Sequence, residues 1–531
     1  MAIAEILSRT RTRIACFGGI PLGDEGRSFL ERGLLVTPCT EDDLRDTAYL
    51  SGVAAVVFTQ NIKKYLSIVP LFEEHAKRLL DHDCSIFVRL APDGRSIIIN
   101  TLNRLELPSA GLSLSEQDSF DAWMPKRSGN PPPPFLYVCD TAIDWAVIAN
   151  LISETPFGKA PNFDLIVDSK DEDGKEIKFS SSNELLIRRA FWDCAEVHLV
   201  PMLDGLSDVL VYRAYAELAK GHYGKWPRPY FVKIGKRAGI FAEYKNYEDG
   251  VRPYIPFHLG PHLVHDRCCL GAEDGIIVGD FVEESESLRD CASDGRAAAA
   301  IACLFNSTLR GWYLHAQNVQ SPLTAYLLPH FPEKIPENRE ARARELGATK
   351  TLSDLRVLFE KCTFSPVLVG PIHGDLHATN VLVRSADAII IDFQKHCENP
   401  IVYDAACLEA GLLVDGFSDD KRDEVEWINS IMPLYRETPL HSASTRCHPS
   451  NQSSWYYACI HQIRLYARRM QHYDDKHGDQ YAAALALALL KKASNKKQFV
   501  KLKESRRAGA YVIAELILTR ISSGISRPPE L

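Results

Sequence analysis

The sequence predicts a doubly wound α/β domain at the N-terminus, followed by an α+β domain with a small β-rich lobe and a large helical lobe. The chain has 531 residues, enough for about three domains. Strand-like and helix-like segments alternate up to residue 160, whereas the chain after Leu288 is mostly helical except for a strand-rich island at Val367–Phe393. Hydrophobic residues make up 46% and charged residues 24%, as is usual for globular proteins.

Short apolar runs in the first 160 residues predict the strands of one sheet. Helical segments are expected between them, at residues 62–80 and at Asp144–Ile152, and Thr40 is a candidate helix N-cap. Because βα alternation requires crossover connections, the sheet should be parallel, with helices on both faces. The predicted strands are Ile14–Phe17, Leu34–Val36, Val53–Phe58, Ser85–Leu90 and Phe135–Cys139.

Composition predicts where the chain divides. We assign 1–160 to the α/β domain, 161–183 to a charged linker or hairpin, 184–285 to the small lobe and 286–531 to the helical lobe. The prolines at 131–134 predict an extended, exposed stretch. In the small lobe we expect strands within residues 203–215, 229–234 and 276–281, and a helix at 239–247.

The strand-rich island carries the chemistry. It contains an apolar strand, a polar loop from His373 to Asn380, two more apolar strands and then Asp392. Asp375 can accept the proton of an attacking hydroxyl, and Asn380 and Asp392 offer the oxygen ligands that Mg²⁺ prefers. His-x-Asp-x₄-Asn followed by a strand and an aspartate is typical of a kinase active site.

A second copy of the tripeptide serves as an internal control. His477-Gly-Asp479 has Ala484 five residues after its aspartate, and an alanine–leucine run follows. We interpret this copy as surface structure. The competing interpretation of the first copy is a polar turn between buried strands, which would leave three proton- or metal-competent groups unused beside a core.

The details of the island resemble the aminoglycoside phosphotransferase and choline kinase branch of the protein-kinase-like superfamily. The resemblance covers about residues 184–523 of the chain. Gly374 stands where protein kinases carry arginine, and Asp392 lies in Ile-Asp-Phe-Gln. The segment from Asn399 to Glu409 resembles a Gly-Asp-Pro-x-x-Asp-Leu-Ala motif of the family. The resemblance implies a bilobal fold, ATP and Mg²⁺, and it implies that His373 and Asp404 support the catalytic loop.

The resemblance also implies a nucleotide side in the small lobe. Gly205 and Ser207 lie in a turn that resembles the phosphate-covering turn of this branch. Lys233, in an apolar strand, matches the phosphate-binding lysine, and Glu243 could pair with it. The alternative for Lys233 is a lysine on an edge strand whose side chain extends to water, and the alternative for Glu243 is a solvent-exposed charge on a helix. Glu248 is a second candidate for the partner of Lys233.

The N-terminal domain resembles a response-regulator receiver in its order of elements only. The positions that need an acidic pair and a phosphoacceptor aspartate hold Gly18-Gly19 and Thr59-Gln60. We therefore expect a receiver-like domain without a phosphoacceptor, which serves as a degenerate sensor or docking domain. This arrangement is similar, more loosely, to phosphotransferase-like domains attached to bacterial signalling or conflict-system proteins.

Charge and cysteine usage limit the partners. The net charge of −8 gives no strong nucleic-acid signal. No apolar run reaches membrane-spanning length, no signal peptide is evident, and the 14 cysteines form no Cys-x-x-Cys pair. We expect a cytoplasmic protein with reduced thiols and no membrane partner.

These observations predict an ATP- and Mg²⁺-dependent phosphotransferase that transfers the γ-phosphoryl group to a hydroxyl of an unknown small molecule or protein. The N-terminal domain would regulate it or recruit a protein partner. The alternative is a nucleotide-binding, pseudokinase-like module of a bacterial signalling or defence assembly, and nucleotidyl transfer is a third possibility.

We expect His377 to be a packed loop residue. The basic helix at residues 455–469 favours an anionic or protein acceptor, unless it is an ordinary amphipathic helix.

Overall fold

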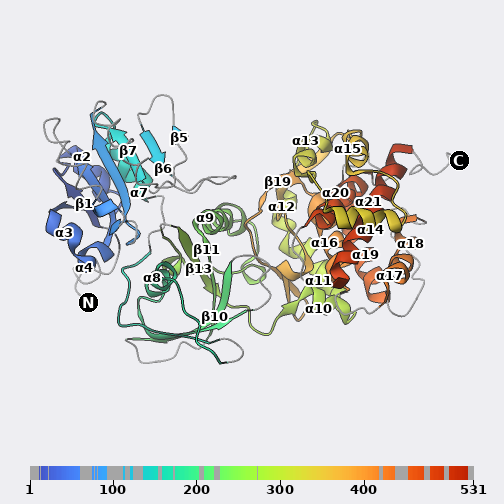
Figure 1. Cartoon of the computed structure of the whole chain (residues 1–531), viewed down its shortest axis with the longest axis horizontal. Helices are drawn as coiled ribbons and strands as arrows, with labels where there is room; N and C mark the ends of the chain where they lie inside the picture. Colours follow the sequence, from blue (N-terminus) through green and yellow to red (C-terminus); the bar gives the residue numbers. More distant parts are fainter. Residues whose placement is uncertain are drawn as a thin grey trace. The chain divides into compact units, whose positions relative to one another are not determined.

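The computed structural model describes residues 11, 13–21, 23–59, 74–76, 78–79, 82–91, 112–113, 120–123, 136–153, 158–170, 174–202, 209–219, 228–271, 273–417, 422–436, 453–471, 479–495 and 501–523. The chain forms two compact units. The first comprises Met1–Tyr244 and His262–Phe281, and the second comprises Lys245–Pro261 and Val282–Leu531 (Figure 1).

The first sheet of the first unit has the predicted parallel core. Its strand order is β2-β1-β3-β4-β7-β6-β5, and the first five strands pair in parallel. The antiparallel strands β6 and β5 extend one edge and were not predicted. The strands are β1 (Arg13–Phe17), β2 (Leu35–Cys39), β3 (Val53–Thr59), β4 (Ser85–Leu90), β5 (Leu112–Ser113), β6 (Phe120–Trp123) and β7 (Leu136–Asp140).

Helices cover both faces of this sheet, as a doubly wound domain requires. Helices α2 (Asp24–Leu30) and α7 (Trp145–Ser153) pack on one face, and α3 (Glu41–Arg45) and α4 (Thr47–Ser51) pack on the other. Thr40 caps α3 in a capping box with Asp43, as predicted. The prolines at 131–134 and most of the helix expected at 62–80 lie outside the described residues.

The second sheet of the first unit is the β-rich part expected for the small lobe. Its order is β12-β13-β11-β10-β9-β8, and α8 (Ser181–Ala190) packs on it. Helix α9 (Arg237–Asn246) directly follows β11, and a 3₁₀ turn, η4 (His265–Arg267), precedes β12. The strands are β8 (Ile166–Ser169), β9 (Cys194–Pro201), β10 (Leu210–Leu218), β11 (Tyr230–Lys236), β12 (Cys269–Leu270) and β13 (Asp274–Asp280).

A buried arginine joins the two sheets of the first unit. Arg189 of α8 is fully buried, and its guanidinium donates to the backbone carbonyls of Ser51 at 3.2 Å and His82 at 3.1 Å. Its Nε also lies 3.5 Å from the carboxylate of Asp83. Burial lowers the pKa of Arg189 to about 10. Because a buried charge that loses its partners is costly, this contact ties the α/β domain to the β-rich part.

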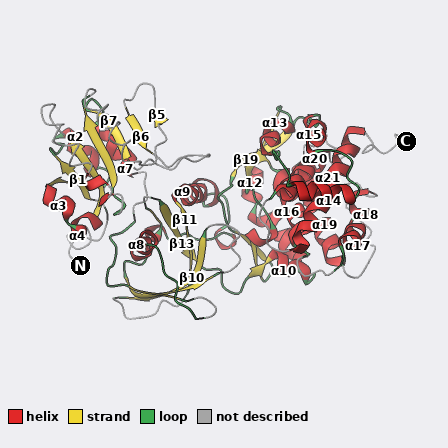
Figure 2. Cartoon of the chain, viewed as in Figure 1, coloured by secondary structure: helices red, strands yellow, loops and turns green. Residues whose placement is uncertain are grey.

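Helices dominate the second unit (Figure 2). Helices α16, α20 and α21 pack together at its centre, and the alanine–leucine run Tyr481–Leu490 of α20 is wholly buried there. None of the described helices is both long and apolar enough for a bilayer. The helices are α10 (Leu288–Ser293), α11 (Ala297–Cys303), α12 (Arg310–Leu314), α13 (Leu323–Leu327), α14 (Glu337–Glu345), α15 (Leu352–Glu360), α16 (Val402–Asp415), α17 (Glu424–Ile431), α18 (Pro433–Arg436), α19 (Ser454–Ala467), α20 (Asp479–Ser494) and α21 (Lys501–Ser523).

Shorter helical turns join these elements. Two are π-helical, and the others are 3₁₀ turns. They are η2 (Tyr247–Val251), η3 (Phe257–Leu259), η5 (Leu304–Thr308), η6 (Leu328–His330), η7 (Ala378–Asn380) and η8 (Arg468–Met470).

Two small antiparallel sheets hold the strand-rich island. Strand β16 (Val367–Ile372) pairs with β15 (Gln317–Val319) and β19 (Cys397–Pro400). Strand β17 (Val381–Arg384) pairs with β18 (Asp387–Ile390) and β14 (Glu286–Ser287). The loop from β16 to β17 carries Asp375 and ends in η7, and Asp392 follows β18. The order of strand, loop, hairpin and aspartate is therefore as predicted.

Candidate functional site

A buried carboxylate holds the loop that follows β16. Asp404, in the first turn of α16, is fully buried, and its two oxygens accept hydrogen bonds from the backbone amides of His373 at 2.7 Å and Gly374 at 3.0 Å. Burial raises the pKa of Asp404 to about 6, although His373 and the two amides act in the opposite direction. The carboxylate fixes the start of the loop through its backbone, whatever side chains follow.

Gly374 is sterically required at its position. Its φ is +77°, and a Cβ there would lie 2.3 Å from the backbone oxygen of Lys395. A side chain would therefore overlap the backbone as well as strain it. The path of the backbone at Lys395 therefore accounts for the glycine at this position.

The loop is also tied to the segment that contains Asp392. The buried His373 ring places Nε2 2.9 Å from the backbone oxygen of Ile391 and packs against the ring of Phe393, with centroids 5.7 Å apart. The amide of Ile391 donates to the backbone oxygen of Asn380 at 3.0 Å. Asn380 and Asp392 thus belong to segments that are joined by hydrogen bonds.

The three chemical groups of the motif differ in exposure. Asp375 is exposed, whereas Asn380 is buried and its Nδ2 donates to the backbone oxygen of Asp375 at 3.1 Å. That bond leaves Oδ1 as the ligand atom that Asn380 offers. Asp392 has a φ of 67°, a left-handed conformation that costs a non-glycine residue about 1–2 kcal/mol. Such strain is often found at functional sites.

The first unit holds the predicted lysine–glutamate pair. Lys233 Nζ lies 2.6 Å from Glu243 Oε2, and each residue is 7% exposed. Strand β11 is central, between β10 and β13, so the alternative of an edge-strand lysine is wrong. The alternative of a solvated glutamate is wrong as well, and Glu248 pairs with Arg252 at 2.9 Å instead. Gly205 and Ser207 lie outside the described residues.

A pocket of about 360 Å³ opens beside Asp375 in the second unit. Within it, Lys491 Nζ donates to the hydroxyl of Tyr403 at 2.9 Å, and Lys492 Nζ lies 2.8 Å from the carboxylate of Asp415. Asp375 is the single carboxylate among the residues that line the pocket. These are His330, Pro332, Asp375, Leu376, His377, Tyr403, Cys407, Ala488, Lys491, Lys492, Ser494 and Asn495.

His377 forms part of the wall of this pocket. Its Nδ1 is hydrogen bonded to the hydroxyl of Thr379 at 2.8 Å, which agrees with the predicted packed loop residue. Burial, and then the charge of Lys492, lower the pKa of His377 to about 4. The imidazole is therefore neutral at pH 7.

One arginine of helix α19 has a structural role. Arg464 is fully buried, and its guanidinium binds both carboxylate oxygens of Glu409, at 3.1 and 2.7 Å. Arg464 is therefore neither an acceptor-binding cation nor part of a solvated basic face. No residue of α19 lines the pocket beside Asp375. Amphipathic spacing could not show this, because the partner carboxylate comes from another helix.

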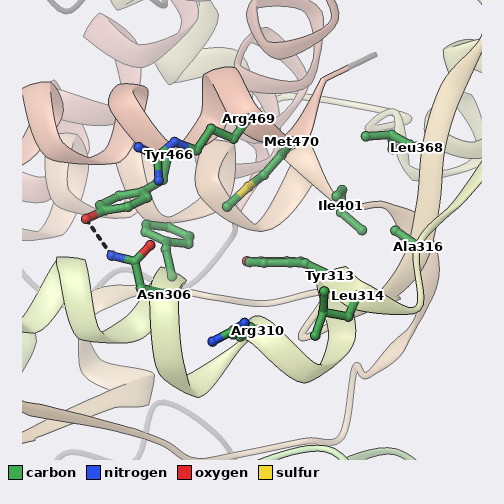
Figure 3. Close-up of a pocket in the computed structure, with 11 residues that line it drawn as sticks. Asn306, Arg310, Tyr313, Leu314, Ala316, Leu368, Ile401, Tyr466, Arg469 and Met470 are labelled. Carbon is green, nitrogen blue, oxygen red and sulfur yellow. Dashed lines mark hydrogen bonds between the residues drawn. The ribbon is translucent and has the colours of Figure 1, made fainter. Parts of the chain in front are cut away.

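A separate pocket of about 420 Å³ lies elsewhere in the second unit (Figure 3). Tyr313, Met470 and Leu368 contribute to its walls, and Asn306 donates to the hydroxyl of Tyr466 at 2.9 Å beside it. Two arginines, Arg310 and Arg469, also line it. None of the residues predicted from the motif reaches this pocket.

The sequence interpretation missed the residues that face Asp375 from other elements. The sequence interpretation assigned no functional role to Lys491 or Lys492. Their position directly after the apolar run Tyr481–Leu490 was the available signal, since charged residues at the end of such a run must meet either solvent or a polar pocket. Tyr403 lies next to Asp404, within a segment already recognised, yet nothing in that segment indicated that it faces a pocket.

A family model described as ternary complex associated domain 9 matches residues 348–492. That stretch includes the loop with Asp375 and ends at Lys492. A comparison with curated protein sequences finds no match.

Solved structures similar to the chain include small-molecule kinases. A glucosamine kinase in complex with glucosamine, ADP and inorganic phosphate is 11% identical, with 67% of this chain and 91% of that chain covered and a TM-score of 0.34. A choline/ethanolamine kinase family protein from Mesorhizobium loti is 14% identical, with 61% and 92% covered and a TM-score of 0.30. An aminoglycoside-3'-phosphotransferase of type VIII is 16% identical, with 50% and 93% covered and a TM-score of 0.27. These structures include an aminoglycoside phosphotransferase and a choline/ethanolamine kinase family protein, the two kinds of kinase that the motif resembles.

Proposed function

We propose that the protein is an ATP- and Mg²⁺-dependent phosphotransferase that acts on a hydroxyl group. The observation that carries the proposal is the braced loop: His373, Asn380 and Asp404 are buried and hydrogen bonded, while Asp375 between them is exposed beside a pocket. A rigid frame around one exposed carboxylate is the arrangement that a positioned catalytic base needs.

Asp375 is the base in this proposal. An acceptor hydroxyl in the adjacent pocket gives its proton to the Asp375 carboxylate as its oxygen forms a bond to the γ-phosphorus of ATP. The bond from the γ-phosphorus to the bridging oxygen breaks, and ADP leaves with that electron pair. The pocket of about 360 Å³ has the size of a small-molecule site.

Asn380 and Asp392 would hold Mg²⁺. Both offer the hard oxygen ligands that this ion selects, and the hydrogen bonds from Ile391 and to Asp375 keep their segments together. The ion, when bound, would neutralise charge on the transferring phosphates. Lys233 would bind the phosphates, held straight by Glu243, and the turn with Gly205 and Ser207 would cover them.

Substitution of the base tests the proposal. Asp375→Asn keeps the shape of the side chain but removes its basicity, so phosphoryl transfer should fall by at least about a hundredfold. Binding of an ATP analogue with Mg²⁺, measured by calorimetry, should persist, since the base holds neither nucleotide nor metal. Full ADP release by this variant, in the presence of an acceptor, would refute the role of Asp375.

A second candidate function is a nucleotide-binding regulatory module of a multi-protein assembly. The match of residues 348–492 to a family described as ternary complex associated favours it. This function predicts ATP binding without turnover and a partner bound through the N-terminal domain. An assay of ADP release and autophosphorylation separates the two candidates. A product that gains AMP rather than phosphate, identified by mass spectrometry, would indicate nucleotidyl transfer instead.

A further inference from the structure

We propose that the acceptor carries an anionic group, a carboxylate or a phosphate, and that Lys491 binds it. This inference rests on the proposed function, because it concerns the pocket beside Asp375. It adds the chemical class of the substrate, which the motif leaves open.

The charges around the pocket are the first argument. Two lysines line it, against the one carboxylate of Asp375, whereas the two histidines have lowered pKa values and add no positive charge. A cationic acceptor would need carboxylates for its ammonium groups. Here it would have to neutralise Asp375, the group that must take the proton. An anionic acceptor leaves that carboxylate available for the hydroxyl.

The two lysines are not equivalent. Lys492 is neutralised by Asp415 at 2.8 Å and has 22% of its side chain exposed. Lys491 donates to the neutral Tyr403 hydroxyl, and its Nζ lies 5.3 Å from the centre of that ring. Across the described ranges, no carboxylate lies within ion-pairing distance of Lys491. Its ammonium group has three donors, and the Tyr403 hydroxyl takes one of them.

His330 lies close enough to Lys491 for that charge to act on it. His330 lines the pocket, and burial lowers its pKa, followed by the charges of Lys491 and Lys395. Asp375 and Lys491 thus offer two different recognition groups in one small pocket. Asp375 suits the reacting hydroxyl, and Lys491 suits an anion on the same molecule.

The test uses hydroxyl compounds that differ in one charged group. The probes are glycerol and glycerate, and glucose, glucuronate and glucosamine, each supplied with ATP and Mg²⁺ to the full chain. ADP release gives the KM for each acceptor and for ATP, and calorimetry in the presence of ADP gives acceptor binding. Glycerate or glucuronate should bind at least about tenfold more tightly than its neutral counterpart, because a charge-assisted hydrogen bond is gained.

Three variants isolate Lys491. Lys491→Ala should weaken binding of the anionic acceptor about tenfold or more, with less than about a twofold change in the KM for ATP. Lys491→Arg keeps the charge and should restore much of the binding. Arg310→Ala removes a cation at the separate pocket of the same unit and should change neither quantity (Figure 3).

The outcomes separate this inference from the proposed function. The inference would be overturned if glycerol, glucose or glucosamine bound as tightly as glycerate or glucuronate, or more tightly. It would also be overturned if Lys491→Ala raised only the KM for ATP. The absence of binding by either anionic compound would overturn it as well. If carboxylates bind through Lys491 but no ADP is released with any compound, the anion site stands and phosphotransfer fails.

Discussion

The carboxylate of Asp404 accepts hydrogen bonds from the backbone amides of His373 and Gly374, which precede it by 31 and 30 residues. Strand β16 ends at Ile372, directly before the first of these two residues, and Asp375 follows the second. The position of the exposed carboxylate is therefore set by a buried carboxylate on α16.

Gly374→Ala should disable this loop. A Cβ at residue 374 meets the backbone oxygen of Lys395 at 2.3 Å, in addition to the strain of φ +77°. Because a displacement of about 1 Å can cost a hundredfold in rate, ADP release should fall by about that factor. Thermal unfolding and ADP release, measured on the same sample, check the prediction.

Gly295→Ala is the matched control for Gly374→Ala. Gly295 has a φ of +75°, yet no atom lies within 4 Å of the position of a Cβ. This substitution should cost only the backbone strain, about 1–2 kcal/mol, and leave ADP release unchanged. Equal losses of activity in the two variants would contradict a specific role for the space around Gly374.

Lys233 and Glu243 should behave as a coupled, buried pair. Their charged atoms lie 2.6 Å apart and each residue is 7% exposed, so Lys233→Met leaves an uncompensated carboxylate and should cost about 3–5 kcal/mol of stability. Adding Glu243→Leu should restore most of that loss, whereas binding of the ATP analogue should stay weak in the double variant. Unfolding in urea and calorimetry measure the two effects.

A neighbouring lysine on the same strand provides the control. Lys236 pairs with Asp274 at 2.9 Å, but 49% of its side chain is exposed. Lys236→Met should therefore change stability by less than about 1 kcal/mol and leave nucleotide binding unaltered. If Lys233→Met binds the ATP analogue as tightly as the unsubstituted chain, the pair is structural only.

The sequence predicted those features whose cause is local. Alternating apolar runs predicted the five parallel strands, and the side chain of Thr40 predicted the start of α3, because a strand pattern and an N-cap each depend on neighbouring residues. The spacing of Asp375, Asn380 and Asp392 predicted the order of loop, hairpin and aspartate for the same reason.

Features that depend on distant residues could not be predicted. Arg464 has the sequence context of a surface cation, and only the fold brings Glu409 to it. Lys491 meets Tyr403 across 88 residues. The antiparallel strands β5 and β6 are short, and this edge extension is held by pairing of β6 with β7 and of β5 with β6 rather than by a sequence pattern of its own. The predicted roles of the site residues remain predictions.

Two partly buried histidines should make the stability of the fold sensitive to mild acid. Burial lowers the pKa of both His377 and His396 to about 4, from an ordinary value of 6.5. As the pH falls from 6.5 to about 4, the unfolded chain gains protons that the folded chain cannot bind, so stability falls. Asp404 acts in the opposite direction: its pKa is raised from 3.8 to about 6, so the folded chain binds its proton first. The two histidines should outweigh the one carboxylate.

Two substitutions that should change the pH dependence of stability in opposite directions test this balance. The unfolding midpoint of the full chain is measured between pH 4.5 and 7.5. His396→Gln should reduce the loss of unfolding free energy between pH 7.5 and 4.5 by on the order of 2 kcal/mol, because it removes one proton that only the unfolded chain binds. Asp404→Asn should increase the loss of unfolding free energy as the pH decreases, since it removes the proton that the folded chain binds first. His258→Gln, at an exposed position, changes the number of histidines without touching a buried one and should leave the slope as it is. If His396→Gln and His258→Gln give the same slope, burial of His396 does not govern the acid sensitivity.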